Sequence, residues 1–454
     1  MLTNIKLKNF RAFRENIDIR IKPITILIGR NSAGKSTLIK FLLMLQQTLE
    51  SSESNEGDFF TIEGRHVSLG TFKDLKNTKS NSNGFQFTLN FKTNSLPESI
   101  IQQIREALQK STSIQKLESD SVELSVSLPF STVTTEDALG KITSVKITSP
   151  IKADELMAEY RVSGNIPYRE IPGNKYKHIV TCKIQGEQVI HKEETNLRRT
   201  RFLKFPLPNN PIDILKSAFD NLYLDTVKDE IISIRHLSPV REESERSVVL
   251  GSPPLDDVGH RGEYAMPHLQ RLLTNGGERA DFVLRHIESV IDIEDVKFKS
   301  QVKGFIPEFR AKNKLTGAES YLADFGFGVS QCIPIFVQGA LLSPGKLLIV
   351  EQPEAQIHPT AQLEMGSFFA ELWTERGVPS IIETHSENII IRLRKLIATG
   401  QLNSKDVTVA YFYIKDNSVQ VKNLDINSDG SFEKGLPMEF FGADILEALS
   451  IDIM

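Results

Sequence analysis

Hydrophobic and polar positions divide the N-terminal part of the chain into strands and one helix. Segment 2–13 has apolar residues spaced between lysines and asparagine, which predicts a strand. The nearly all-apolar segment 24–28 predicts a buried strand of an α/β sheet. An apolar helix is expected over 36–49, and the alternation over 85–91 predicts an antiparallel strand.

The pattern changes in the middle of the chain. A polar helix is expected over 97–116, followed by short alternating strands such as 122–128 and 178–183. Proline and glycine turn signals recur between these strands. The middle region therefore predicts an inserted, mostly β accessory domain at 95–231.

Long helices and apolar strands alternate again after residue 231, with the clearest buried strands at 347–350 and 380–384. Both ends of the chain thus have α/β character. We expect them to fold together as one head, with 1–94 as its N-terminal lobe and 232–454 as its second lobe.

Composition narrows the class of protein. The 454 residues are 40% hydrophobic and 25% charged, which excludes a disordered chain. The chain contains no run of about 18 apolar residues, so a membrane-spanning helix is not expected. Two isolated cysteines and the absence of a signal-peptide pattern predict a cytoplasmic location. A net charge of −4 argues against constitutive wrapping of nucleic acid, although a local DNA contact stays open.

The segment 29–37 reads GRNSAGKST and matches G-x-x-x-x-G-K-[ST] between a predicted strand and a predicted helix. Backbone N–H groups of such a loop surround phosphates, and the helix N-terminus adds positive charge. Lys35 is expected to neutralise the β- and γ-phosphates, and Ser36 to ligate magnesium. The nucleotide-binding residues are predicted to be Gly29, Arg30, Asn31, Ser32, Ala33, Gly34, Lys35, Ser36 and Thr37. A chance glycine-rich turn is the alternative, and the flanking strand and helix disfavour it.

Two further apolar strands end in polar residues. Glu351 follows the strand at 347–350 and is predicted to hold magnesium through water; the alternative is a solvated acidic strand end. His385 follows the strand at 380–384 and is predicted to sense the phosphate; the alternative is a structural histidine.

The segment 324–331, DFGFGVSQ, precedes an apolar helix expected over 332–342. Its backbone N–H groups and the hydroxyl of Ser330 could contact a phosphate. An ordinary helix N-cap at Ser330 is the equally weighted alternative.

These motifs together resemble the ABC-type ATPase heads of the SMC, RecF and OLD group. IKLKNFRAF is similar to their first strand, GRNSAGKST to Walker A, LLIVEQPE to Walker B and IIETHSE to the H-loop. DFGFGVSQ is similar to the signature loop of a bacterial subgroup with the EQPE variant. The resemblance covers about 1–94 and 232–454. It implies a P-loop fold of ABC-head type, ATP and magnesium as cofactors, and head-to-tail dimers in which Ser330 contacts the partner's ATP.

The resemblance also places Gln352 where the family has its catalytic glutamate, with Glu351 at the usual aspartate position. An amide cannot accept a proton, and losing a general base costs typically about 10²–10⁴-fold in rate. Slow hydrolysis is therefore expected unless Glu354 or another group polarises the water. The predicted catalytic residues are Glu351, Gln352, Glu354 and His385.

The predicted function is a slowly hydrolysing ATP switch that forms homo-oligomers and regulates an effector protein. Heads of this subgroup resemble ATPase subunits of bacterial anti-phage systems such as Septu, whose separate partner is an HNH nuclease. The alternatives are an SMC- or RecF-like DNA repair ATPase and an ATP-stabilised scaffold that barely hydrolyses. A nuclease within the chain is not expected, because the segment after the H-loop lacks the length and the D-x-D of a Toprim domain.

Overall fold

A computed structural model of the chain describes most of its N-terminal and C-terminal parts and the strands of its middle region. The described residues are 1–51, 60–80, 84–92, 118–119, 121–129, 141–149, 151–152, 157–167, 176–184, 187–195, 225–243, 256–300 and 307–433. They form two compact units. The first unit is Met1–Ile21, Ser36–Ser233 and Tyr413–Val421, and the second is Lys22–Lys35, Ile234–Phe412 and Lys422–Met454.

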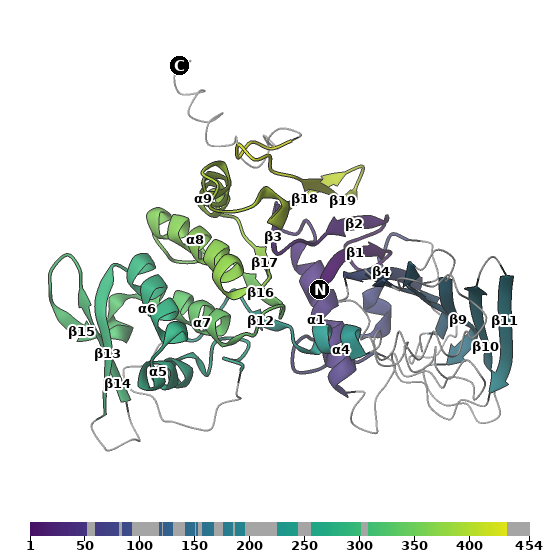
Figure 1. The fold of residues 1–454 in the computed structure, drawn as a ribbon, viewed down its shortest axis with the longest axis horizontal. Helices are drawn as coiled ribbons and strands as arrows, with labels where there is room; N and C mark the ends of the chain where they lie inside the picture. The colour runs from purple at the N-terminus through teal and green to yellow at the C-terminus, as the bar shows by residue number, and fades with distance from the viewer. Residues whose placement is uncertain are drawn as a thin grey trace, which may run out of the picture. The chain divides into compact units, whose positions relative to one another are not determined.

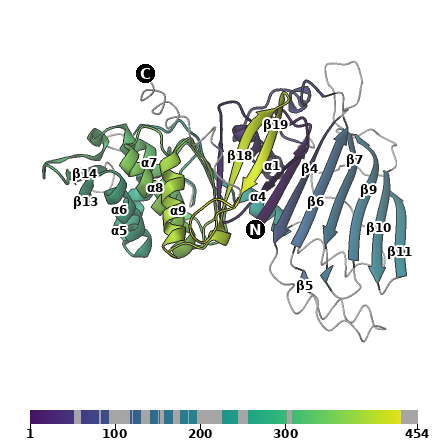
Figure 2. The same ribbon diagram turned by 90° about the horizontal axis from the view of Figure 1, so that it is seen from above.

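The first unit contains an eight-stranded antiparallel sheet with the order β11-β10-β9-β7-β6-β4-β1-β2 (Figure 2). Its strands are β1 (Leu2–Lys8), β2 (Ile17–Arg20), β4 (Gly84–Lys92), β6 (Ser121–Pro129), β7 (Lys141–Ser149), β9 (Met157–Pro167), β10 (Tyr176–Ile184) and β11 (Glu187–Thr195). A separate short pair joins β5 (Glu118–Ser119) to β8 (Ile151–Lys152).

The predicted inserted β region is confirmed, and its strands continue the sheet that β1, β2 and β4 begin. Strand β6 pairs directly with β4 along its whole length. The domain boundaries at 94/95 and 231/232 stay predictions. The helix predicted at 97–116 lies outside the described residues.

Phenylalanines hold helix α1 (Lys35–Ser51) on the first unit's sheet. The ring of Phe41 lies 5.4 Å from that of Phe10 and 5.1 Å from that of Phe87, and all three are buried. The strand predicted at 2–13 is shorter than expected, because β1 ends at Lys8. Asn9 and Arg11 adopt φ values of 58° and 45°, which turn the chain out of the sheet. A short helix, α4 (Asp225–Ile232), completes the unit.

A sheet with the order β12-β16-β17-β3-β18-β19 lies mostly in the second unit, with Tyr413–Val421 of its last two strands assigned to the first. Its strands are β3 (Ile24–Gly29), β12 (Arg235–Leu237), β16 (Leu348–Glu351), β17 (Ser380–Glu383), β18 (Val407–Lys415) and β19 (Ser418–Leu424). The ladders from β12 through β18 are parallel. The predicted α/β class and the strands predicted at 24–28, 347–350 and 380–384 are confirmed.

The described part of the second unit also contains five helices and a small sheet, most of which lie on one side of these strands (Figure 1). The helices are α5 (Ala265–Asn275), α6 (Glu278–Val290), α7 (Phe327–Leu341), α8 (Pro359–Arg376) and α9 (Glu387–Ala398). The sheet consists of β13 (Ile293–Ser300), β14 (Pro307–Asn313) and β15 (Glu319–Tyr321). Helix α7 contacts β12 and β16, and α8 contacts β3. No helix in the described part of the chain has the length and apolar character needed to cross a membrane.

A buried histidine packs among the aromatic side chains between α6, α7 and α8. His286 lies 5.0 Å from the ring of Phe368 and 5.9 Å from that of Phe336. Burial, reinforced by the charge of Arg285, lowers the pKa of His286 to about 3. The unfolded chain therefore binds more protons than the folded chain between about pH 6.5 and pH 3, so stability falls as the pH drops through that window.

We expect His286→Phe to reduce this acid sensitivity. The histidine contributes a loss of up to about 1.4 kcal/mol per pH unit below its unfolded pKa, and phenylalanine removes the titrating group while keeping a ring. Urea unfolding at pH 7 and pH 5, followed by the fluorescence of the single tryptophan, Trp373 on α8, measures the difference. His358→Gln, at an exposed histidine, is the control. Equal acid sensitivity of wild type and His286→Phe would contradict the assignment.

Candidate functional site

The parallel ladder brings three strand ends to one edge of the second unit's sheet. Strand β17 lies between β16 and β3, and Glu383 is paired in register with Glu351 on one side and Leu27 on the other. The carboxyl ends of these strands therefore lie side by side. In open α/β sheets, ligands bind at this edge.

The loop after β3 has the backbone conformation expected of a phosphate loop. Gly29 has a φ of 142°, and a Cβ atom there would lie 2.2 Å from the carbonyl oxygen of Phe412. Ser32 and Gly34 also have positive φ values, of 62° and 97°. Arg30, Asn31 and Ser32 are exposed, whereas Ala33 and Gly34 are buried. Helix α1 begins directly after this turn, with the half-buried Ser36 and Thr37 in its first turn.

Lys35 is a buried cation at the start of α1, with 3% of its surface exposed. Its Nζ donates hydrogen bonds to the carbonyl oxygens of Gly29 at 2.8 Å and Arg30 at 3.1 Å. The carboxylate of Glu383 lies 4.0 Å from the same ammonium. Burial lowers the pKa of Lys35, and the negative charges of Glu383 and Glu354 oppose that shift. The ammonium is thus fixed at the loop and held against a carboxylate.

Glu383 was not singled out from the sequence, although it is the last residue of an apolar strand and precedes His385 by two positions. It is 4% exposed. Only its place beside Lys35 shows that a buried carboxylate faces the predicted phosphate-binding lysine.

Glu351 lies at the end of β16, as predicted, and is held at two points. Its Oε1 lies 2.7 Å from Nε2 of His236. Its carbonyl oxygen accepts a hydrogen bond of 2.6 Å from the guanidinium of Arg241. Its side chain is 13% exposed, so one face of the carboxylate remains near solvent.

Arg241 is buried, with 3% of its surface exposed. It also donates to Oε1 of Gln331 in the first turns of α7, at 3.2 Å. Burial lowers the pKa of Arg241 to about 10. Arg241 therefore links Glu351 to α7.

The segment after Glu351 is tied to the end of β17. Gln352 has a φ of 46°, and its backbone N–H donates to the carbonyl oxygen of Glu383 at 2.7 Å. Glu354 accepts hydrogen bonds of 2.7 Å from the hydroxyl of Thr384 and from the backbone N–H of His385. Both carboxylate oxygens of Glu354 are therefore engaged in holding the two strand ends together.

His385 lies in the turn after β17 and is exposed. Desolvation of part of its ring and the positive charge of Lys35 lower its pKa, against the opposing charges of Glu354 and Glu383. A lowered pKa keeps the imidazole neutral at pH 7. The neutral ring can donate one hydrogen bond to an oxygen of a phosphate.

Ser330 lies inside α7 rather than before it. The helix begins at Phe327 with Gly326 as its N-cap residue, whose φ is 92°, so the alternative of an N-cap at Ser330 is wrong. The helix was expected to start at 332, and it starts earlier because Gly326 supplies the turn that the cap position requires. Ser330 is 4% exposed. Its role toward a partner's nucleotide stays a prediction.

The two residues predicted to hold magnesium, Ser36 and Glu351, have side chains of a suitable kind. A serine hydroxyl and a carboxylate offer the hard oxygen ligands that magnesium prefers. Among the described residues, no three or more His, Cys, Asp or Glu side chains gather closely enough to hold a metal ion alone. Magnesium in such sites usually takes its remaining ligands from water and phosphate, so a small protein donor set fits.

Comparison with known proteins found a matching family model and several similar solved structures. No curated protein matches the chain. An SMC head bound to the C-terminal winged-helix domain of ScpA has 12% identity and a TM-score of 0.41, covering 93% of this chain and 98% of that one. The SMC head domain from Thermotoga maritima has 9% identity and a TM-score of 0.37, covering 94% and 99%.

The Smc head from Pyrococcus furiosus, with an extended coiled coil and bound to the C-terminal domain of ScpA, has 12% identity and a TM-score of 0.41, with 99% of each chain covered. The sequence model described as "AAA ATPase domain" matches residues 1–242 and 270–390. Both the phosphate loop and the ends of β16 and β17 fall inside the matched segments. Since the match covers more than half of the chain, this protein belongs to the AAA ATPase domain family.

Proposed function

We propose that the protein is an ATP-dependent switch that binds ATP with magnesium at the carboxyl edge of its parallel sheet, hydrolyses it slowly, and assembles to control an effector. The observation that carries the proposal is the placement of Lys35. A buried ammonium at the first residue of a helix, beside the strand ends that carry Glu351 and His385, has the chemistry of a phosphate site.

Bound ATP with magnesium would supply the transferable phosphoryl group and the positive charge that stabilises its attack by water. Lys35 would shift its hydrogen bonds from the carbonyls of Gly29 and Arg30 to phosphate oxygens. The N–H groups of residues 30–37 would surround the phosphates, and Ser36 and Glu351 would hold the metal. Neutral His385 would donate a hydrogen bond at the γ-phosphate.

Gln352 supports slow turnover, because its amide can orient a water molecule but cannot remove its proton. Glu354 is the other acidic candidate in this segment. Its two oxygens already accept hydrogen bonds from Thr384 and His385, which assigns it a tethering role. An ATP-stabilised scaffold with almost no turnover is the second candidate function, and Gln352 is the residue that favours it.

The partner of the switch is inferred from the resemblance of its motifs to ATPase subunits of bacterial anti-phage systems. We propose a homo-oligomer, promoted by ATP, that regulates a separate effector such as an HNH nuclease. Closed symmetric assemblies are the usual outcome for soluble homo-oligomers. Gly326, in the segment 324–331 that resembles a signature loop, is exposed, so a second copy of the chain could contact this segment.

The binding site is tested by Lys35→Ala. We expect at least about a tenfold loss of ATP affinity, because the variant lacks the cation that meets the β- and γ-phosphates. Titration of a fluorescent ATP analogue measures the loss. Lys40→Ala, at an exposed lysine of the same helix, should bind like wild type. Equal affinity of Lys35→Ala and wild type would reject the site.

The chemistry is tested at Gln352. Gln352→Glu supplies a carboxylate next to the proposed water and should raise single-turnover phosphate release by about tenfold or more, a cautious part of the usual general-base contribution. Glu354→Gln keeps one acceptor oxygen for the tether and should change the rate less. If Gln352→Glu is no faster and Glu354→Gln is inactive, Glu354 is the base instead.

Assembly is tested at Ser330, which is too buried to accept a larger residue without disturbing α7. Ser330→Ala removes only the hydroxyl, and the protein concentration needed for ATP-dependent assembly should rise by about tenfold, the worth of one hydrogen bond to a charged group. Light scattering with and without ATP measures assembly. Ser343→Ala, at an exposed serine after α7, is the control. Unchanged assembly of Ser330→Ala would exclude a contact across the interface.

A further inference from the structure

A histidine on the strand next to Glu351 connects its carboxylate to a loop. His236 belongs to β12 and is paired in register with Ile349 of β16. Its side chain is 4% exposed. Nε2 of the ring lies 2.7 Å from Oε1 of Glu351, and Nδ1 lies 2.8 Å from Nδ1 of His260. Both nitrogens of His236 therefore have a defined partner.

The two contacts determine where the protons lie. A carboxylate only accepts hydrogen bonds, so Nε2 of His236 must carry a proton that it donates to Glu351. When His236 is neutral, its Nδ1 is then an acceptor, and His260 must donate from its own Nδ1. The hydrogen bond to Glu351 therefore sets the tautomer of His236, and a donor at Nδ1 of His260 completes the pair.

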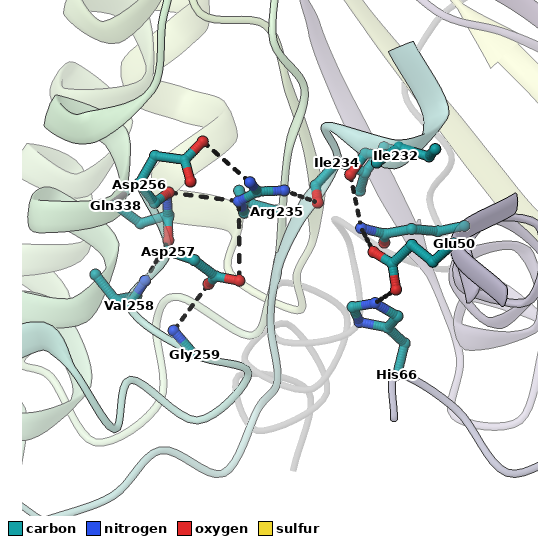
Figure 3. A network of polar contacts seen from close by, with 11 residues as sticks. Glu50, His66, Ile232, Ile234, Arg235, Asp256, Asp257, Val258, Gly259 and Gln338 are labelled. Carbon is teal, nitrogen blue, oxygen red and sulfur yellow. Dashed lines mark hydrogen bonds and ion pairs between the residues drawn. The ribbon is translucent and has the colours of Figure 1, made fainter. Parts of the chain in front are cut away.

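The loop that carries His260 is held by the residue after β12 and by α7. Its carbonyl oxygen accepts a hydrogen bond of 3.0 Å from the N–H of Ser238. At the start of the same loop, the side chain of Gln338 on α7 accepts from the N–H of Val258 at 2.9 Å and donates to the carbonyl of Asp256 at 3.0 Å. Figure 3 shows the contacts of Gln338 with Val258 and Asp256, together with Arg235, whose guanidinium reaches the carboxylate of Asp256 at 3.0 Å.

Close packing adds to these hydrogen bonds. Gly262 has a φ of 82°, and a Cβ atom there would lie 2.6 Å from the ring of Pro334 on α7. The segment 256–264 thus has little freedom to withdraw His260 from His236. The chain of contacts from α7 to the carboxylate of Glu351 is continuous.

We propose that His236 is a positioning residue for Glu351, and that the contact with His260 holds its ring in place. The inference rests on the proposed function, in which Glu351 holds magnesium. The hydrogen bond from Nε2 engages Oε1 and restricts the rotation of the carboxylate. Groups that orient a metal ligand in this way typically change metal affinity by about 10–100-fold when they are removed.

The experiment measures the magnesium dependence of nucleotide binding, which does not require turnover. A fluorescent ATP analogue is titrated into the full-length chain with EDTA, and then at increasing magnesium concentrations. The variants are His236→Phe, which keeps a ring without an N–H group, His236→Gln, which keeps a donor, and His260→Phe. The variant Glu351→Gln tests whether Glu351 itself is the magnesium ligand.

The chain offers a matched control in its first unit. Nε2 of His66 lies 2.8 Å from Oε2 of Glu50, which is the same pair of groups at nearly the same distance (Figure 3). His66→Phe removes this contact and should leave the magnesium dependence unchanged.

We expect His236→Phe to raise the magnesium concentration for half-maximal binding of the ATP analogue by about 10–100-fold. The affinity for the analogue measured in EDTA should stay unchanged. His236→Gln should recover most of the loss, and His260→Phe should show part of it. A shift with Glu351→Gln but none with His236→Phe overturns the inference and leaves the proposed function intact. No shift with Glu351→Gln rejects Glu351 as the metal ligand, and the inference with it. If circular dichroism shows that His236→Phe is unfolded, wild-type behaviour of His260→Phe overturns the inference.

Discussion

The parallel pairing of β17 with β16 and β3 is the constraint on which the candidate site depends. Strand β3 is more than 300 residues away in the chain from β16 and β17, and the ladder joins Leu27, Glu383 and Glu351 in one register. A slip of one residue would turn every side chain of a strand to the opposite face. The almost complete burial of all three strands makes such a slip costly, because it would disturb packing on both faces. The positions of the polar strand ends follow from that register.

The site places charged groups where water is scarce, and each is compensated by hydrogen bonds or opposite charge. Lys35 and Arg241 are each 3% exposed and Glu383 is 4% exposed. Leaving any one of them without a partner would be strongly destabilising, since an uncompensated buried charge typically costs about 3–5 kcal/mol. Backbone carbonyls at the ends of β3 and β16 accept from the two cations, so the strand ends and the charges stabilise one another. Polar groups held in this way are oriented before a ligand arrives, which reduces the ordering that binding would require.

The sequence by itself determined the features that depend on neighbouring residues. The phosphate loop was predicted because a glycine-rich turn between an apolar strand and a helix is a local pattern, and the loop has the expected backbone. Strands β3, β16 and β17 were predicted because buried parallel strands are continuous apolar runs. Local patterns did not predict the ends of elements that are set by the backbone angle of one residue. Strand β1 ends early at Lys8 and α7 starts early at Phe327, because positive φ values at the adjacent Asn9 and Gly326 redirect the chain.

Only the tertiary structure decided which polar residues accompany the phosphate loop. His236, Arg241 and His260 lie outside the quoted motifs, and Glu383 lies in the H-loop segment without being singled out. Each of the four has a polar partner that is distant in the chain. A histidine beside a glutamate 115 positions away leaves no periodic trace in the sequence. The reason is physical: hydrophobic periodicity records which face of an element is buried, whereas the pairing of elements sets which buried polar groups meet.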